Sequence, residues 1–154
     1  MSEIAFTPDD MVSAKKDFRA IIVVSEYIKN VRFGGMQLHI EMQTETYDKN
    51  QHEWLSPSDK LKTKWAHFIK ALSDCGALKD MSFEGKDSEE RMQNFAKSLL
   101  GMQFRFVEYT DLPSIAKNRV TGKFEVELTI PKEYLGKTEI GEIQKKTVGE
   151  VDLT

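Results

Sequence analysis

The sequence predicts a mainly β domain that also contains helix: a strongly curved, five-stranded antiparallel sheet, one long helix and a second, shorter helix. Two observations support this fold class. Several segments alternate apolar and polar residues with the period of two that is typical of strands, and two segments space their apolar residues as helices do. A length of 154 residues fits one ordinary domain.

The first two strands are expected to form a hairpin. Residues 17–29 (DFRAIIVVSEYIK) are rich in β-branched and aromatic side chains and are apolar on both faces at their centre, as in a long central strand. Residues 30–35 (NVRFGG) have the composition of a turn, in which Gly34 and Gly35 can adopt positive φ. Residues 36–42 then alternate, which predicts a half-buried partner strand.

The segment after this hairpin predicts a loop followed by the long helix. Residues 46–57 are polar and are interpreted as a long loop, so any third strand has to come from residues 44–55. Ser58, or Ser56, can cap a helix that runs to about Cys75. The helix has one apolar stripe, formed by Leu61, Trp65, Phe68, Ile69 and Leu72.

The rest of the chain predicts the shorter helix and two more strands. Residues 88–99 place acidic residues first and are followed by glycine at 101, as in a capped helix. Residues 102–107 and 123–130 alternate again and are expected to pair as neighbours. After Pro131 the periodicity is lost. The inward-facing residues of these strands are Met102, Phe104, Phe106, Phe124, Val126, Leu128 and Ile130.

The charge is distributed unevenly along the chain. We divide it into an N-terminal arm (1–14), a domain (15–136) and a flexible acidic tail (137–154). The formal net charge is −3, but without residues 1–10 and 138–154 there remain 20 basic and 18 acidic residues, a charge of +2. The body is therefore mildly basic, and nucleic acid is not excluded as a partner.

Cysteine content and hydropathy indicate a cytoplasmic protein, in a prokaryotic cell or a virus-infected host cell. The single cysteine, Cys75, cannot form an intramolecular disulfide. The longest nearly uninterrupted apolar run, residues 20–24, is far shorter than the roughly 20 residues that span a bilayer. No membrane partner is expected.

No motif indicates catalysis, a metal or a cofactor. The three histidines, His39, His52 and His67, lack the spacing of known zinc motifs, so no metal site is expected. The close glycine pair, Gly34 and Gly35, lies in the expected hairpin and not in a phosphate-binding loop. We therefore expect a protein that is not an enzyme and has no cofactor.

The positive signal is a set of basic residues interleaved with aromatic ones. A single-strand binder needs cations along the phosphates and aromatic faces on which bases stack. Arg19, Tyr27 and Lys29 share parity and would face outward together if no bulge intervenes. Each aromatic residue could instead pack on the protein: Phe33 on its own hairpin, and Trp54 by folding back over a core edge. The candidate nucleic-acid-binding residues are Arg19, Tyr27, Lys29, Arg32, Phe33, Tyr47, Lys49, Trp54 and Arg105.

The order of elements over residues 15–135 is similar to that of the oligonucleotide/oligosaccharide-binding (OB) fold, a five-stranded Greek-key barrel with a helix between its third and fourth strands. Within that fold the chain resembles the small single-stranded DNA-binding proteins of phages and prokaryotic replication systems. The likeness rests on the hairpin at 17–43, the strand GMQFRFVEY and the ending GEIQKKTVGEVDLT. It departs from the family in its tail, where Lys145 and Lys146 dilute the acidic residues.

The resemblance implies a non-catalytic protein that binds single-stranded DNA, or RNA, with little sequence preference during replication or repair. It also implies a homo-oligomer and contacts to replication proteins through the tail. The alternative is a structural or assembly module that binds protein, in a phage particle or a multi-subunit complex. A small-molecule or oligosaccharide binder is a third possibility, in which the basic residues would have no evident role.

Overall fold

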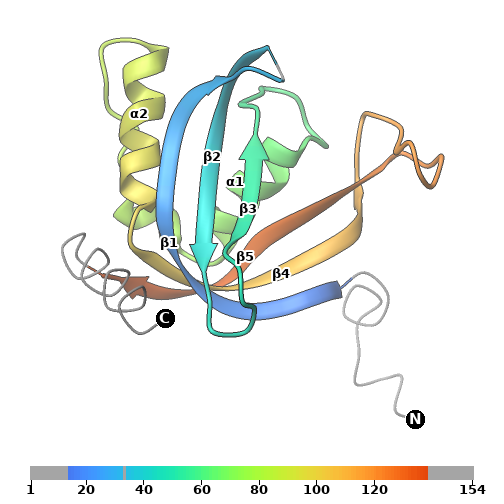
Figure 1. Cartoon of the computed structure of the whole chain (residues 1–154). Helices are drawn as coiled ribbons and strands as arrows, with labels where there is room; N and C mark the ends of the chain where they lie inside the picture. Colours follow the sequence, from blue (N-terminus) through green and yellow to red (C-terminus); the bar gives the residue numbers. More distant parts are fainter. Residues whose placement is uncertain (1–13, 33, 139–154) are drawn as a thin grey trace.

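The computed structural model describes residues 14–32 and 34–138, which form a five-stranded antiparallel sheet with helices packed on it (Figure 1). The strand order is β3-β2-β1-β4-β5, and the sheet is open, with β3 and β5 at its edges. The predicted class, mainly β with helix, is confirmed. The elements are β1 (Ala14–Asn30), β2 (Gly35–Gln43), β3 (Gln51–Leu55), α1 (Lys64–Asp74), the 3-10 helix η3 (Ala77–Asp80), α2 (Ser88–Leu99), β4 (Met102–Pro113) and β5 (Glu125–Lys137).

Strand β1 is long enough to pair with two neighbouring strands. Its first half pairs with β4 and its second half with β2, and it bends between them (Figure 1). The register with β2 shifts between Ile22 and Val24, so one extra residue is inserted there. Because side chains alternate along a strand, this bulge reverses which parity faces the core. Phe18 faces the core before the bulge and Tyr27 after it.

The helices cover the apolar face of the sheet. Helix α2 packs against β1 and α1 packs against β5. Phe68 of α1 and Phe95 of α2 are fully buried in one core with Phe104 and Phe106 of β4. Helix α2 has the predicted bounds, since the Asp87 side chain caps it by accepting a 2.8 Å hydrogen bond from the backbone N–H of Glu90.

Two predictions for the middle of the chain need correction. The segment interpreted as a loop contains β3, which pairs with β2. Helix α1 begins at Lys64 and not near Ser58, because Thr63 provides the cap and Lys62 has a φ of 60°, which no right-handed helix includes. Leu61 consequently lies outside the helix and is 81% exposed, whereas the sequence placed it on the apolar stripe.

The last strand also extends beyond its predicted end. Strand β5 continues through Pro131 to Lys137, although periodicity is lost there in the sequence. A register shift against β4 falls between Pro131 and Glu133, and a proline is tolerated at such a bulge on an edge strand. Phe124, predicted to face inward, lies before β5 and is exposed. Of the predicted arm and tail, residues 1–13 and 139–154 lie outside the described residues.

Candidate nucleic-acid interface

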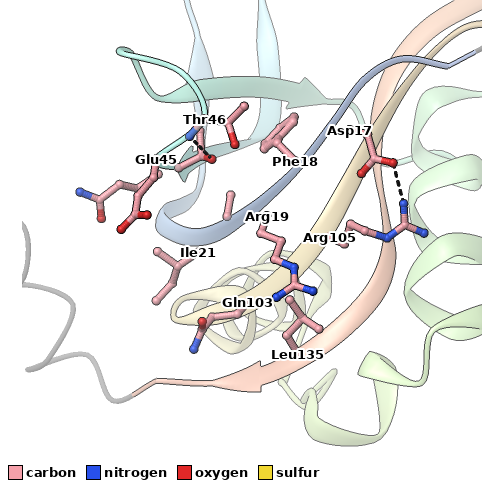
Figure 2. Close-up of a pocket in the computed structure, with 12 residues that line it drawn as sticks. Asp17, Phe18, Arg19, Ile21, Glu45, Thr46, Gln103, Arg105 and Leu135 are labelled. Atoms are coloured by element: carbon pink, nitrogen blue, oxygen red, sulfur yellow. Dashed lines mark hydrogen bonds and ion pairs between the residues drawn. The ribbon is translucent and has the colours of Figure 1, made fainter.

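Two of the predicted basic residues meet on the outer face of the sheet. Arg19 of β1 and Arg105 of β4 are directly opposite each other in the ladder and line a groove of about 670 Å³. Gln103 and Leu135 also line this groove, which we call the arginine groove (Figure 2). The sheet thus brings together two cations that are 86 positions apart in sequence.

The two arginines differ in their partners. Nη1 of Arg105 donates to Oδ2 of Asp17 at 2.8 Å, and its Nε donates to Oε2 of Glu133 at 3.3 Å. Partial burial lowers the pKa of Arg105, but the two carboxylates outweigh it and raise the pKa above its usual value. Within residues 14–32 and 34–138, no hydrogen bond or ion pair engages the exposed Arg19 side chain, so Arg19 is the cation more available to a ligand.

The bulge in β1 separates other residues that were predicted to act together. Tyr27 packs against the core and does not share the outer face with Arg19. Lys29 is exposed near the end of β1, and Arg32 is exposed in the following turn. Phe33 lies outside the described residues. The expected common face of Arg19, Tyr27 and Lys29 is therefore wrong, because the bulge inserts one residue between the first of them and the other two.

The Tyr47 ring packs against other side chains of the protein. Its ring lies edge-on to Phe18, with centroids 5.4 Å apart, and Nζ of Lys16 lies 5.1 Å from its centroid. The ring is half-buried against the core, so it offers a base less surface than a free ring would. Lys49, in the same β2–β3 connection, is exposed.

Trp54 lies on the outer face of the sheet and not in a loop. It is opposite His39 in the β2–β3 ladder, and the two rings stack with centroids 4.1 Å apart and planes 13° apart. His52, also on β3, has its ring centroid 5.3 Å from that of His39. We call Trp54, His39 and His52 the ring row. Trp54 is 36% exposed and its ring is already held in place by His39, so it would lose less conformational entropy in a further stacking contact.

The connection between β4 and β5, residues 114–124, is a basic segment that we did not select from the sequence. It contains Lys117, Arg119 and Lys123 and no acidic residue. We call it the basic loop. Oδ1 of Asn118 accepts hydrogen bonds from two backbone N–H groups of the loop, which gives it a defined shape. The sequence signal was the presence of three basic residues among apolar ones, with no acidic residue, in SIAKNRVTGKF.

The basic loop lies beside a second basic segment. The backbone N–H of Ile115 donates to the carbonyl of Lys62 at 3.0 Å, which places the loop next to the lead into α1. That lead contains Lys60 and Lys62, and Lys64 is the first residue of the helix. Apolar side chains are exposed among these bases: Val120 is 93% exposed and Phe124 is 62% exposed.

Strands β2 and β3 also bring together groups that can bind a metal. The group consists of His39, Glu41 and His52: one nitrogen of each histidine and one carboxylate oxygen of Glu41 lie within 4.8 Å of one another. In the described part of the chain, no other three metal-binding side chains come this close together. Partial burial, followed by the charge of His52, lowers the pKa of His39. The spacing of these residues in sequence did not predict the group.

Comparisons of the chain with protein-family models, with curated proteins and with solved structures found no match. Among the residues that the structure describes, no helix is both long and apolar enough to cross a membrane. A functional assignment therefore depends on the residues and their geometry.

Proposed function

We propose that this protein is a non-catalytic binder of single-stranded nucleic acid, DNA in the first place, with little sequence preference. The observation that supports this most is the basic loop, which contains three basic residues, no acidic residue and exposed apolar residues such as Phe124. These exposed side chains do not contribute to the hydrophobic core, so packing does not explain their presence. A flexible polyanion with exposed bases complements such a surface.

The ring row would supply the second ingredient, an aromatic platform. Stacking of one base on an aromatic side chain contributes about 1–3 kcal/mol. The exposed Trp54 is backed by His39, so a base stacking on its ring would meet a preformed surface. The basic loop and Arg19 would then contact phosphates.

The strand order supports an OB-like reading of the fold as part of this proposal. Adjacent strands in the open sheet are those that neighbour each other in an OB barrel, and the barrel would close between β3 and β5. Oε2 of Glu53 on β3 accepts a 2.9 Å hydrogen bond from the backbone N–H of Thr129 on β5, so the two edges approach each other there. In the OB fold the face of strands 2 and 3 and the loops 1–2 and 4–5 bind oligonucleotides. Here these are the ring row, the turn with Arg32 and the basic loop.

The test is a fluorescence-anisotropy titration of labelled oligo-dT, the RNA equivalent and a matched DNA duplex at two salt concentrations. We expect preference for single strands, and Trp54→Ala should weaken binding roughly 5- to 140-fold, which corresponds to about 1–3 kcal/mol. Phe83→Ala is the matched control, because Phe83 is also exposed but contacts Phe95 of α2 and not the ring row. Absence of binding to either single strand at low salt would refute the proposal.

The alternative proposal, a protein-assembly module, is favoured by exposed apolar side chains, of which Val31, Leu61 and Val120 are each more than four-fifths exposed. Self-association that increases with concentration in sedimentation experiments, together with no affinity for nucleic acid, would support it. A homo-oligomer on DNA and recruitment of replication proteins through residues 137–154 stay predictions.

A further inference from the structure

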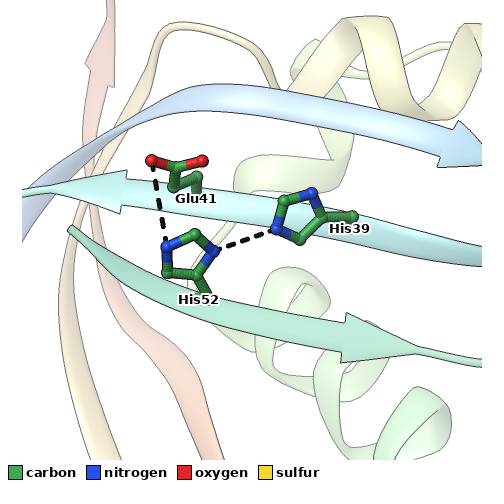
Figure 3. Close-up of side chains that lie close together, drawn as sticks. All are labelled: His39, Glu41 and His52. Carbon is green, nitrogen blue, oxygen red and sulfur yellow. Dashed lines mark hydrogen bonds and ion pairs between the residues drawn. The ribbon is translucent and has the colours of Figure 1, made fainter. Parts of the chain in front are cut away.

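Three potential metal ligands converge on the outer face of the β2–β3 hairpin (Figure 3). His39 and Glu41 are two positions apart on β2 and so point to the same side, and His52 is opposite Glu41 on β3. Nε2 of His39 lies 3.0 Å from Nδ1 of His52, and Nε2 of His52 lies 3.9 Å from Oε1 of Glu41. The proposed function uses the rings of His39 and His52 only as part of a stacking surface and does not account for the carboxylate of Glu41 beside them, and no sequence motif predicted the group.

We propose that His39, Glu41 and His52 form a surface site for a divalent transition-metal ion, Zn²⁺ by its ligand chemistry. Two imidazoles and one carboxylate are a ligand set that zinc accepts, with water at the remaining position. Imidazole nitrogens discriminate against Mg²⁺ and Ca²⁺, which prefer oxygen ligands.

The separation of the two imidazole nitrogens is close to the spacing that the ion requires. With Zn–N bonds of 2.0–2.1 Å, tetrahedral geometry sets neighbouring donor atoms roughly 3.3 Å apart. The 3.0 Å separation involves Nδ1 of His52 and the 3.9 Å separation its Nε2, and one ion would use only one of these nitrogens. With one donor atom from each residue, the three atoms lie within 4.8 Å of one another. To bind the ion, the two rings would turn so that their nitrogens face it, and the Glu41 carboxylate would rotate inward. The ladder between β2 and β3 fixes the backbone positions of the three residues, so only their side chains need to rotate to bind the ion. Asn50 donates a 2.8 Å hydrogen bond to Oε1 of Glu41 and so helps to orient the carboxylate.

The competing explanation is a hydrogen bond between two imidazoles with no affinity for metal. The two explanations differ in a direct metal titration, which needs no nucleic acid and is therefore independent of the proposed function. The third histidine is a natural control. His67 is on α1, where its Nε2 lies 2.6 Å from the carbonyl oxygen of Pro113, away from the hairpin.

The experiment is calorimetric titration of the full, untagged chain with zinc chloride, on the wild type and on His52→Ala, Glu41→Gln and His67→Gln. We expect one ion per chain with a Kd below about 100 µM. His52→Ala should weaken binding at least about tenfold, by loss of a ligand, and Glu41→Gln should also weaken it. His67→Gln should bind as the wild type does. His52 is exposed, so its replacement leaves the core intact, which thermal unfolding of each variant verifies.

A spectroscopic readout locates the ion independently of the variants. Titration with Co²⁺, which is paramagnetic, should broaden the imidazole NMR signals of His39 and His52 and leave those of His67 sharp. It should also quench the fluorescence of Trp54, whose ring is stacked on His39. Zinc binding weaker than the stated limit, equal weakening in His67→Gln, or broadening of His67 alone would each overturn the proposal.

Discussion

Under the proposed function, neutralising the basic loop should change the salt dependence of nucleic-acid binding by a calculable amount. The variant is Lys117→Gln, Arg119→Gln and Lys123→Gln in one chain. Each phosphate contact to a single strand contributes about 0.7 to the slope of log K against log salt concentration, so loss of three contacts should reduce that slope by about 2. A fourfold rise in salt should then weaken the wild type roughly 20-fold more than the variant.

The assay is anisotropy of labelled oligo-dT over a salt series from about 50 to 200 mM, a range in which such slopes are linear. The loop should stay folded, because backbone groups and the Asn118 side chain hold it. Of the three replaced side chains, Lys117 contacts the loop, with its Nζ 5.8 Å from the centroid of the exposed Phe124 ring. The control is Lys79→Gln, Lys86→Gln and Lys97→Gln, which removes the same charge from exposed positions on or near η3 and α2. Equal slopes for the two triple variants would refute the reasoning, since net charge alone would then explain the effect.

Two further predictions concern stability. Phe104→Ala should lower the free energy of unfolding by about 3–5 kcal/mol because the ring is fully buried. Phe124→Ala should change it by less than about 0.5 kcal/mol because that ring is 62% exposed. Urea denaturation of both variants measures the two changes, and equal losses would contradict the assigned core. Burial raises the pKa of Glu53, so the wild type should lose stability as pH rises from its unfolded-state pKa of about 4.5 through the raised folded-state value. Glu53→Gln keeps an oxygen that can accept the hydrogen bond from the N–H of Thr129, but it cannot ionise. The variant should therefore not lose this stability, and its Tm should rise relative to that of the wild type between pH 4 and pH 7. A Tm difference that stays constant over this pH range would contradict the prediction.

The elements that the sequence predicted well are those with local signals. Helix α2 was predicted with its bounds because the segment has acidic residues in its first turn and is followed by Gly101. The β1–β2 hairpin was predicted because glycines follow a long apolar strand, and Gly34 does adopt a φ of 84°. Both signals act over a few residues, so no tertiary contact was needed to recognise them.

The elements that the sequence missed depend on contacts distant along the chain. Strand β3 has only five residues, in a polar segment, and is defined by its ladder with β2 and the buried side chain of Leu55. The start of α1 was misplaced because both serines and Thr63 are acceptable caps in sequence. The turn at Lys62, whose carbonyl accepts from Ile115, selects Thr63.

The candidate site was predicted least well because one inserted residue decides which side chains face outward. Before the bulge in β1 Arg19 faces outward, and beyond it Glu26 does so, opposite His39. The outer face beside the ring row therefore receives a carboxylate where the sequence placed Tyr27 and Lys29. A strand lying along Trp54 would find few cations on β1, so its phosphates would need those of the basic loop and of Arg19. Under the proposed function, the charge of the basic loop, and not that of the first hairpin, should therefore control the salt dependence of binding.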